Sequence, residues 1–413
     1  MLKMKRLYQK FASVTCVAIA ALLCFTLYMQ VTLPDDFYVV EGEPFSIRAG
    51  RYITAMEPAE GLPAHAYDQS GNSYHLDLKM FGAIGIKQVN VQVVERNYVI
   101  PGGNPFGLKM FTEGVMVVGL SDINLDGQAV NPAKEAGIAT GDIILSIGGR
   151  KVSSNEDVAA AVSGSQGKAV AVELRRKNTR MKVSLKPVKS PDDGSYKAGI
   201  WVRDSSAGIG TMTYYNPTSM AYGGLGHAIC DVDTGELMPL SSGEIVGVTI
   251  TGVGKGVSGK PGELRGSFNG SGRMGSLEMN NETGVFGLLE RIPVSGEAIP
   301  LAVRHEVQTG PAEIRTTLSG DKPQNYSIVI EKINFSDSNP TKNMVIRVTD
   351  PTLLEKTGGI VQGMSGSPII QNGRLVGAVT HVFVNDPTRG YAIFAENMEK
   401  SSKIIESGSR KVS

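Results

Sequence analysis

The stretch Gly358-Gly359-Ile360-Val361-Gln362-Gly363-Met364-Ser365-Gly366-Ser367-Pro368-Ile369-Ile370 decides how the C-terminal half of this 413-residue sequence folds. Glycines on both sides of Ser365 let the backbone turn sharply, so the serine hydroxyl stands clear of the chain. Amide N–H groups in such a turn point to where a carbonyl oxygen would become charged, and we expect those of Gly363 and Ser365 to do so. Ser365 is therefore a candidate acyl-transfer nucleophile. Ser367 is a rival that only the register of the motif disfavours.

A β-hairpin is predicted immediately after this loop. Two apolar runs, residues 369–371 and 374–379, flank Asn372-Gly373, which is the strongest short hairpin signal. A G-x-S-G-x-P loop that leads into a hairpin resembles the nucleophile region of chymotrypsin-like serine peptidases, and this resemblance implies a β-barrel catalytic domain. The best-known form of the motif is G-D-S-G-G-P, and Met364 stands here in place of its aspartate. Activation through a buried new N-terminus, which pairs with that aspartate, is therefore not expected.

The composition bounds the fold class and the partners. The chain has 50 glycines and only 6% aromatic residues, which favours many short strands and turns, so we expect a mainly β protein. Its 41 basic and 40 acidic residues give no electrostatic reason to expect nucleic acid, so the partner should be a protein or peptide. Cys230 follows His227 by three residues, but without further Cys or His nearby we expect no metal and no cofactor.

Residues 1–33 contain the signature of a membrane anchor. Lys3, Lys5, Arg6 and Lys10 precede residues 11–29, which carry no charge, and about 20 apolar residues are needed to cross a bilayer. The basic flank belongs in the cytoplasm, so the bulk of the chain should lie outside it. A cleaved signal peptide is the competing interpretation.

Residues 34–98 mix alternating apolar runs with Gly and Pro clusters and predict a small β-rich spacer.

Residues 99–189 resemble a PDZ domain, which is an α+β unit. The pattern A-G-I-x-x-G-D-I-I-L-x-I-x-G begins at Ala136 and is specific, because each glycine marks a turn between apolar elements. A PDZ groove takes an extended peptide as an added strand beside a helix, here predicted over residues 155–163. By resemblance, the loop that holds the peptide should involve Gly107, Leu108, Gly114 and Val115.

The region from residue 196 to 413 follows a polar linker and carries the candidate chemistry. His227 is set among glycines, so both ring nitrogens have room to act, one toward a nucleophile and one toward an orienting group. Asp350 lies fifteen residues before Ser365 and is the candidate orienting group. It also fits the N-cap of a short helix that begins with Pro351. The rival carboxylates are Asp231, Asp233 and Asp337.

Residues 254–260 match the spacing of a phosphate-binding loop, G-x-x-x-x-G-K, but a functional loop continues with Ser or Thr into a helix. Pro261 stands at that position and disfavours both the magnesium ligand and the helix. We therefore reject nucleotide binding for this segment and expect a loop.

Taken together, the anchor, the PDZ unit and the motifs around His227, Asp350 and Ser365 are similar to the family of stage IV sporulation protein B, PDZ-containing serine peptidases of endospore-forming bacteria. The pieces that carry the resemblance are Gly208-Ile209-Gly210-Thr211, Leu225-Gly226-His227, Lys260-Pro261-Gly262-Glu263-Leu264, Thr349-Asp350-Pro351 and the stretch from Gly359 to Pro368.

The resemblance implies a catalytic triad of His227, Asp350 and Ser365. It also implies secretion from the forespore into the space between two membranes and cleavage of a membrane-bound regulator that leads to activation of a late sigma factor. Because tethering confines the modules near one membrane, we also expect self-cleavage. The alternative function is a membrane-tethered PDZ scaffold with an inactive peptidase-like domain. The His, Asp, Ser order fits a chymotrypsin-like arrangement, but the spacings differ from ordinary members, so the strand order is not predicted.

Overall fold

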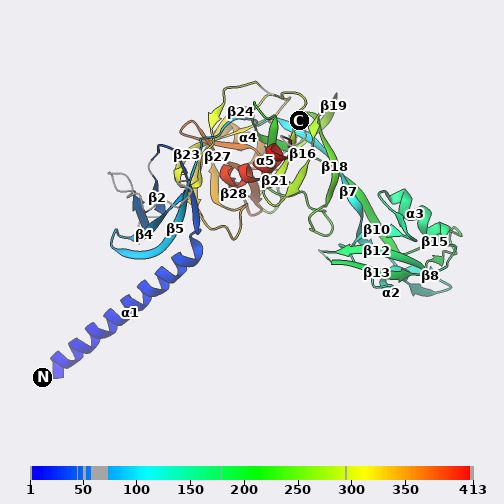
Figure 1. The fold of residues 1–413 in the computed structure, drawn as a ribbon, viewed down its shortest axis with the longest axis horizontal. Helices are drawn as coiled ribbons and strands as arrows, with labels where there is room; N and C mark the ends of the chain where they lie inside the picture. Colours follow the sequence, from blue (N-terminus) through cyan, green and yellow to red (C-terminus); the bar gives the residue numbers. More distant parts are fainter. Residues whose placement is uncertain are drawn as a thin grey trace.

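The computed structural model in Figure 1 describes residues 2–43, 45–49, 53–56, 73–177, 179–293 and 295–409. The chain is mainly β, as predicted. A long N-terminal helix projects from one end, a small sheet follows it, a β-rich body forms the centre, and the PDZ unit lies at the far end.

Helix α1 (Leu2–Thr32) is the predicted apolar helix. Its segment Tyr8–Thr32 has a mean hydropathy of 2.1, and by length and composition it could cross a membrane. An anchor and a signal sequence both satisfy this test.

The predicted β-rich spacer forms a five-stranded sheet in the order β1-β5-β4-β3-β2. Residues 57–72 of the spacer lie outside the described residues. Phe37 and Phe45 of this sheet belong to the same apolar core as Ile346 of the central barrel, so the spacer packs directly on the catalytic region. The strands are β1 (Asp36–Val40), β2 (Ser46–Ala49), β3 (Ile53–Met56), β4 (Ser73–Met80) and β5 (Ile84–Val94).

Two long strands join the PDZ unit to the body. Strands β7 (Pro105–Leu120) and β16 (Ile200–Tyr215) have 16 residues each and pair antiparallel along their length (Figure 1). The PDZ elements lie between them in the sequence and pack at one end of the pair. The main ones are α2 (Pro132–Glu135), β10 (Ile143–Ile147), α3 (Asn155–Gly164), β12 (Val170–Arg176) and β13 (Thr179–Leu185).

The structure divides the chain differently from the expected boundary between residues 99–189 and 196–413. Strand β6 (Tyr98–Pro101) pairs with the end of β16, and the first half of β7 pairs with β18 (Leu240–Gly254). Because a 16-residue strand is roughly 50 Å long, one strand can belong to both units. The PDZ unit is therefore inserted between two strands of the catalytic region.

The catalytic region has two parts. The first contains the ends of β7 and β16 with β17 (Ala221–Gly224), β18, β19 (Glu263–Ser276), β20 (Met279–Asn281) and β21 (Gly284–Leu288). The second is a closed barrel in the order β23-β24-β25-β28-β27-β26, which confirms the expected barrel. Its strands are β23 (Gly310–Thr316), β24 (Gln324–Ile333), β25 (Met344–Val348), β26 (Pro368–Gln371), β27 (Arg374–Phe383) and β28 (Asp386–Phe394), with α4 (Pro351–Thr357) before β26 and α5 (Ala395–Ser409) after β28.

The predicted hairpin connects β26 to β27. Asn372 and Gly373 have φ of 52° and 74°, which is the left-handed conformation that a two-residue hairpin turn requires. This hairpin closes the barrel directly after the Ser365 loop.

Candidate active site

Strand β16 holds the loop that carries Ser365. The Thr211 N–H donates to the Ser365 carbonyl at 3.1 Å, and the Thr211 hydroxyl donates to the Gly363 carbonyl at 2.7 Å. The Thr213 hydroxyl donates to the Gly366 carbonyl at 2.8 Å. Both threonines are buried. Three carbonyl groups of the loop are thereby turned toward β16, which fixes the backbone on both sides of the serine.

Two N–H groups of this loop, those of Gly363 and Ser365, meet no acceptor within the described residues. The carbonyl of each of these peptide units is nevertheless held. Gln362 O accepts from the Leu264 N–H at 2.8 Å, and Met364 O accepts from the N–H three residues later at 2.9 Å. Because a trans peptide unit is planar, a fixed carbonyl also fixes the opposite direction of its N–H. Two fixed, unused donors beside a serine are what an oxyanion hole requires.

The two serines of the motif have different surroundings. The Ser365 hydroxyl donates to the Thr380 carbonyl at 2.9 Å, and the residue is half-buried. Ser367 is 0% exposed, and its hydroxyl has no hydrogen-bond partner among the described residues. A fully enclosed hydroxyl cannot reach a substrate carbonyl, so the geometry favours Ser365 over Ser367.

His227 follows β17 after a sharp turn through Leu225 and Gly226, whose φ values are 64° and 70°. Its Nδ1 lies 2.8 Å from the Ala228 carbonyl. Since a carbonyl oxygen only accepts, Nδ1 carries the proton and Nε2 is left as an acceptor. Burial lowers the pKa of His227 below its ordinary value, so the ring is neutral near pH 7. A general base needs this state.

Ser365 and the turn that carries His227 lie against two consecutive residues of β27, Thr380 and His381. Thr380 accepts the Ser365 hydroxyl, and its methyl carbon is 3.1 Å from the position that a Cβ at Gly226 would occupy. The ring centroids of His227 and His381 are 5.1 Å apart. Desolvation of the His381 ring, together with the positive charges that His227 and nearby Lys342 can carry, lowers the pKa of His381 to about 4. The structure therefore brings together two of the three predicted catalytic residues.

Asp350 lies elsewhere. It follows β25 and caps α4, where its Oδ1 accepts from the Leu353 N–H at 3.0 Å. His381 pairs with Tyr391 on β28, which pairs with Val345 on β25. Asp350 is five residues beyond Val345, so at 3.3 Å per residue it lies about 16 Å further along the chain. The helix-cap interpretation is confirmed, and the role of Asp350 beside His227 stays a prediction that the observed arrangement does not support.

The rival carboxylates are also engaged elsewhere. Asp231 and Asp233 both pair with Arg203, and Asp337 pairs with the buried Arg304 at 2.8 Å. Among the hydrogen bonds of the described residues, the Ala228 carbonyl is the partner of the His227 ring. A main-chain carbonyl thus fixes the tautomer in the observed arrangement.

Sequence reasoning missed the roles of Thr211, Thr213, Thr380 and His381. Thr211 lies in the quoted motif Gly208-Ile209-Gly210-Thr211, which marked its position without its partner. The contact between Thr211 and Gly363 spans 152 residues, and no local pattern predicts such a pairing. Thr380 and His381 lie in a strand that was predicted only as the second half of a hairpin.

The predicted peptide-binding residues Gly107, Leu108, Gly114 and Val115 require correction. Leu108 pairs with β16 on one edge and with β18 on the other, and Gly107 does the same. Val115 is buried and pairs with β10, beside Gly114. Strand β7 has neighbours on both edges, so it offers no free edge to which a peptide strand could add.

The free edge belongs instead to the start of β16. Residues 200–203 pair with β7 on one side, and within the described chain no strand pairs with their other side. Helix α3 begins beside this edge, because the Asn155 N–H donates to the Asp204 carboxylate at 2.9 Å. A strand edge next to a helix is the geometry of a PDZ groove.

Residues 254–260, with the spacing of a phosphate loop, form the turn between β18 and β19, in which the Val257 N–H donates to the Lys260 carbonyl at 3.0 Å. No helix follows within this described segment, which agrees with the rejection of nucleotide binding.

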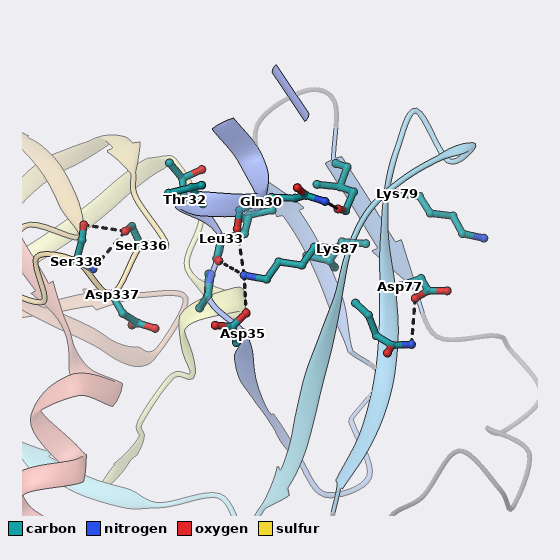
Figure 2. A pocket seen from close by; sticks show the side chains of 16 residues that line it. Gln30, Thr32, Leu33, Asp35, Asp77, Lys79, Lys87, Ser336, Asp337 and Ser338 are labelled. Atoms are coloured by element: carbon teal, nitrogen blue, oxygen red, sulfur yellow. Dashed lines mark hydrogen bonds and ion pairs between the residues drawn. The ribbon is translucent and has the colours of Figure 1, made fainter. Parts of the chain in front are cut away.

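A cavity of about 890 Å³ lies where α1 meets β4 and β5, with residues 336–338 on its opposite wall (Figure 2). Lys87 reaches into this region and donates to the Leu33 carbonyl at 2.7 Å. None of the residues that line the cavity belongs to the loops of His227 or Ser365, so it is separate from the candidate active site.

Comparison with known families agrees with this geometry. Residues 194–399 match the model of the SpoIVB peptidase S55 family, and residues 129–176 match that of the PDZ domain. Residues 194–399, which include His227 and Ser365, are thus similar to the SpoIVB peptidase S55 family. The resemblance drawn from the motifs is thereby confirmed.

Individual relatives match smaller parts. A probable periplasmic DegP-like serine endoprotease of Brucella suis biovar 1 is 28% identical over 189 residues, which is 41% of this chain and 37% of the relative. Serine protease HTRA1 of Xenopus tropicalis is 43% identical over 56 residues, 14% of this chain and 12% of the relative. The chain thus spans little more than a third of the first relative. The solved structure of the active form of Rv3671c protease from M. tuberculosis is 14% identical and covers 48% of this chain and 74% of its own, with a TM-score of 0.28.

Proposed function

We propose that this protein is a serine endopeptidase in which Ser365 is the nucleophile and His227 is the general base. The observation that supports this most strongly is the pair of fixed, unused N–H donors at Gly363 and Ser365. They lie beside a half-buried serine that bonds to Thr380 of β27, and the next residue of that strand, His381, lies against His227. No residue of this site requires a metal or a cofactor for the chemistry.

In the proposed reaction the Ser365 hydroxyl turns from the Thr380 carbonyl toward Nε2 of His227 and loses its proton to that nitrogen. Its Oγ forms a bond with the scissile carbonyl carbon, and the Gly363 and Ser365 N–H groups stabilise the resulting oxyanion. His227 then gives the proton to the leaving amine as the peptide bond breaks. Water, activated by the same ring, releases the acyl group and restores the serine. The predicted contribution of Asp350 to this sequence is an open proposal, to be decided by mutation.

The test compares two serines two residues apart. Ser365→Ala should lower turnover roughly a millionfold and abolish labelling by a fluorophosphonate probe. Ser367→Ala is the matched control, because it removes a buried, unpaired hydroxyl and should leave both activities within about threefold of wild type. A folded wild-type protein that the probe does not label would refute the proposal and favour the alternative of an inactive PDZ scaffold.

For the substrate, we propose a membrane-bound regulatory protein of sporulation, whose cleavage between the two forespore membranes leads to activation of a late sigma factor. The match to the SpoIVB peptidase S55 family and the apolar helix α1 support this proposal. Self-cleavage between residues 34 and 98 is part of it. Co-expression of the full chain with a candidate regulator should give cleavage products of both proteins in wild type and of neither in Ser365→Ala.

We further propose that the groove between α3 and residues 200–203 of β16 binds an extended peptide. The Ser121 N–H donates to the Gly199 carbonyl, so the backbone groups of Gly199 face β7. In an antiparallel pair, successive residues of a strand face opposite sides, so the N–H and carbonyl of Ile200 face away from β7, toward the proposed groove. Trp201 is the single tryptophan of the chain and is 65% exposed, so its fluorescence reports on this edge. We expect some synthetic peptides with a free C-terminus to change this fluorescence, and their N-methylated forms, which cannot pair with a strand, to leave it unchanged.

A further inference from the structure

Arg203 lies where the PDZ unit meets the catalytic region. It is the last residue of the proposed peptide-binding edge of β16, at a point where the pairing with β7 shifts its register between Arg203 and Ser205. The neighbouring residue Asp204 accepts a hydrogen bond from the first residue of α3, Asn155. Consecutive residues of one strand thus face two different units.

The Arg203 guanidinium binds the loop that follows His227. One of its nitrogens pairs with Asp231, and another pairs with Asp233 at 2.8 Å. The Asp231 side chain is 0% exposed, and its other oxygen accepts from the backbone N–H groups of Asp233 and Thr234. Burial disfavours ionisation of Asp231, but these hydrogen bonds and Arg203 outweigh burial and hold the pKa of Asp231 below its ordinary value. The buried charge therefore depends on Arg203 as its partner.

The loop is rigid between Asp231 and His227. The Asp231 N–H donates to the Glu236 carbonyl, which closes the loop. The Ile229 N–H donates to the Asn280 side chain at 2.8 Å, and that side chain donates back to the Ile229 carbonyl at 3.0 Å. Only three residues separate Asp231 from His227, so a displacement of the ion pair reaches the His227 ring through a short, hydrogen-bonded segment.

We propose that Arg203 is a positioning residue for the serine peptidase reaction, and that it links the peptide-binding strand of the PDZ unit to the loop of His227. This inference rests on the proposed function of Ser365 and His227. An ion pair in this position makes the placement of the general base depend on the packing of β16 against α3. The catalytic centre is then sensitive to what the PDZ groove holds, although the Arg203 guanidinium is bound to Asp231 and Asp233 and does not contact the scissile bond.

The test uses full-length protein and two arginines with the same chemistry. Arg203→Met removes the charge and keeps the aliphatic stem, and we expect the rate of fluorophosphonate labelling and the kcat of a small ester to fall at least tenfold, with KM little changed. Arg176→Met is the matched control, since Arg176 pairs in the same way with the buried Asp142 inside the PDZ unit, at 2.7 Å. This control should label within about twofold of wild type. Arg203→Lys should recover part of the loss.

Coupling to the PDZ unit is tested through Asp204→Ala, which frees the start of α3. We expect a loss of labelling rate of at least threefold in the wild-type background and no further loss in Arg203→Met. Equal losses in both backgrounds would refute the link through Arg203, as would wild-type labelling by Arg203→Met. If Arg203→Met does not fold, Arg203→Lys replaces it in the same comparison. Failure of wild-type labelling would instead refute the proposed function of Ser365.

Discussion

Replacing Asp350 separates its observed role as a helix cap from its predicted role beside His227. As a cap, asparagine serves nearly as well as aspartate, whereas alanine costs about 1 kcal/mol of stability. As the orienting group of a triad, loss of the carboxylate charge lowers kcat about ten thousandfold. The structure predicts the first outcome. Two unit charges separated by about 16 Å, the length of chain between Val345 and Asp350, interact by roughly 0.3 kcal/mol at a dielectric constant of 80 and by about 1 kcal/mol at 20. We therefore expect Asp350→Asn to change kcat/KM by no more than about fivefold.

The assay measures ester hydrolysis and urea unfolding for Asp350→Asn and Asp350→Ala. Ser154→Ala is the control for cap loss, because Ser154 caps α3 in the PDZ unit by accepting from the Asp157 N–H. It should cost similar stability with little effect on ester hydrolysis. A thousandfold loss of activity in a folded Asp350→Asn protein would show that the carboxylate reaches His227 in the working enzyme, and would refute the reasoning from the observed geometry.

Three further predictions concern the same loop and base. Because burial lowers the pKa of His227 below 6.5, the neutral base persists at lower pH, so kcat/KM for an ester should stay constant from pH 8 to 7 and fall only below about 6.5. A fall that begins above pH 7 would contradict this. Gly366 has a φ of 92°, and a Cβ at this position would collide with the Thr211 carbonyl, so Gly366→Ala should lower the free energy of unfolding in urea by at least about 3 kcal/mol. Gly373→Ala is the control, because Gly373 has a φ of 74° but open space around it, and it should lower the free energy of unfolding by about 1 kcal/mol. Thr211→Val leaves the Gly363 carbonyl without the Thr211 hydroxyl as its donor, so it should lower the free energy of unfolding by about 1 to 3 kcal/mol and should also lower kcat. An unchanged kcat would show that this hydrogen bond does not support the proposed oxyanion hole.

The features that the sequence predicted correctly depend on local chemistry. The Asn372-Gly373 turn and the helix cap at Asp350 each need particular residues within a few positions. The same holds for the Ser365 loop, whose glycines at 363 and 366 have φ of 94° and 92°. Patterns of this kind can be identified without knowing what lies across from them in space.

The features that could not be predicted from the sequence depend on pairing between strands that are far apart along the chain. Alternating apolar residues in β7 predict a strand but do not show that β16 and β18 occupy its two edges, so the sequence assigns peptide binding to residues whose strand edges are already paired. The insertion of the PDZ unit has the same origin, because β7 and β16 each continue into both units. Local periodicity gives no sign of where one unit ends within a continuous strand.

Apart from Thr349-Asp350-Pro351, the motifs that carried the family resemblance have a common physical explanation in the structure, because they converge on the Ser365 loop. Thr211 holds the loop carbonyls from one side, and Leu264 holds the Gln362 carbonyl from another. The Leu225 N–H donates to the Thr211 carbonyl at 3.3 Å, next to the place where a Cβ at residue 366 would collide. The barrel contributes the serine, and the first part of the catalytic region supplies bonds from Thr211, Thr213 and Leu264 that hold its loop. The proposed oxyanion hole therefore depends on the contact between the two parts, and a strand that provides this contact, β16, is the one that continues through Arg203 to the proposed peptide-binding edge.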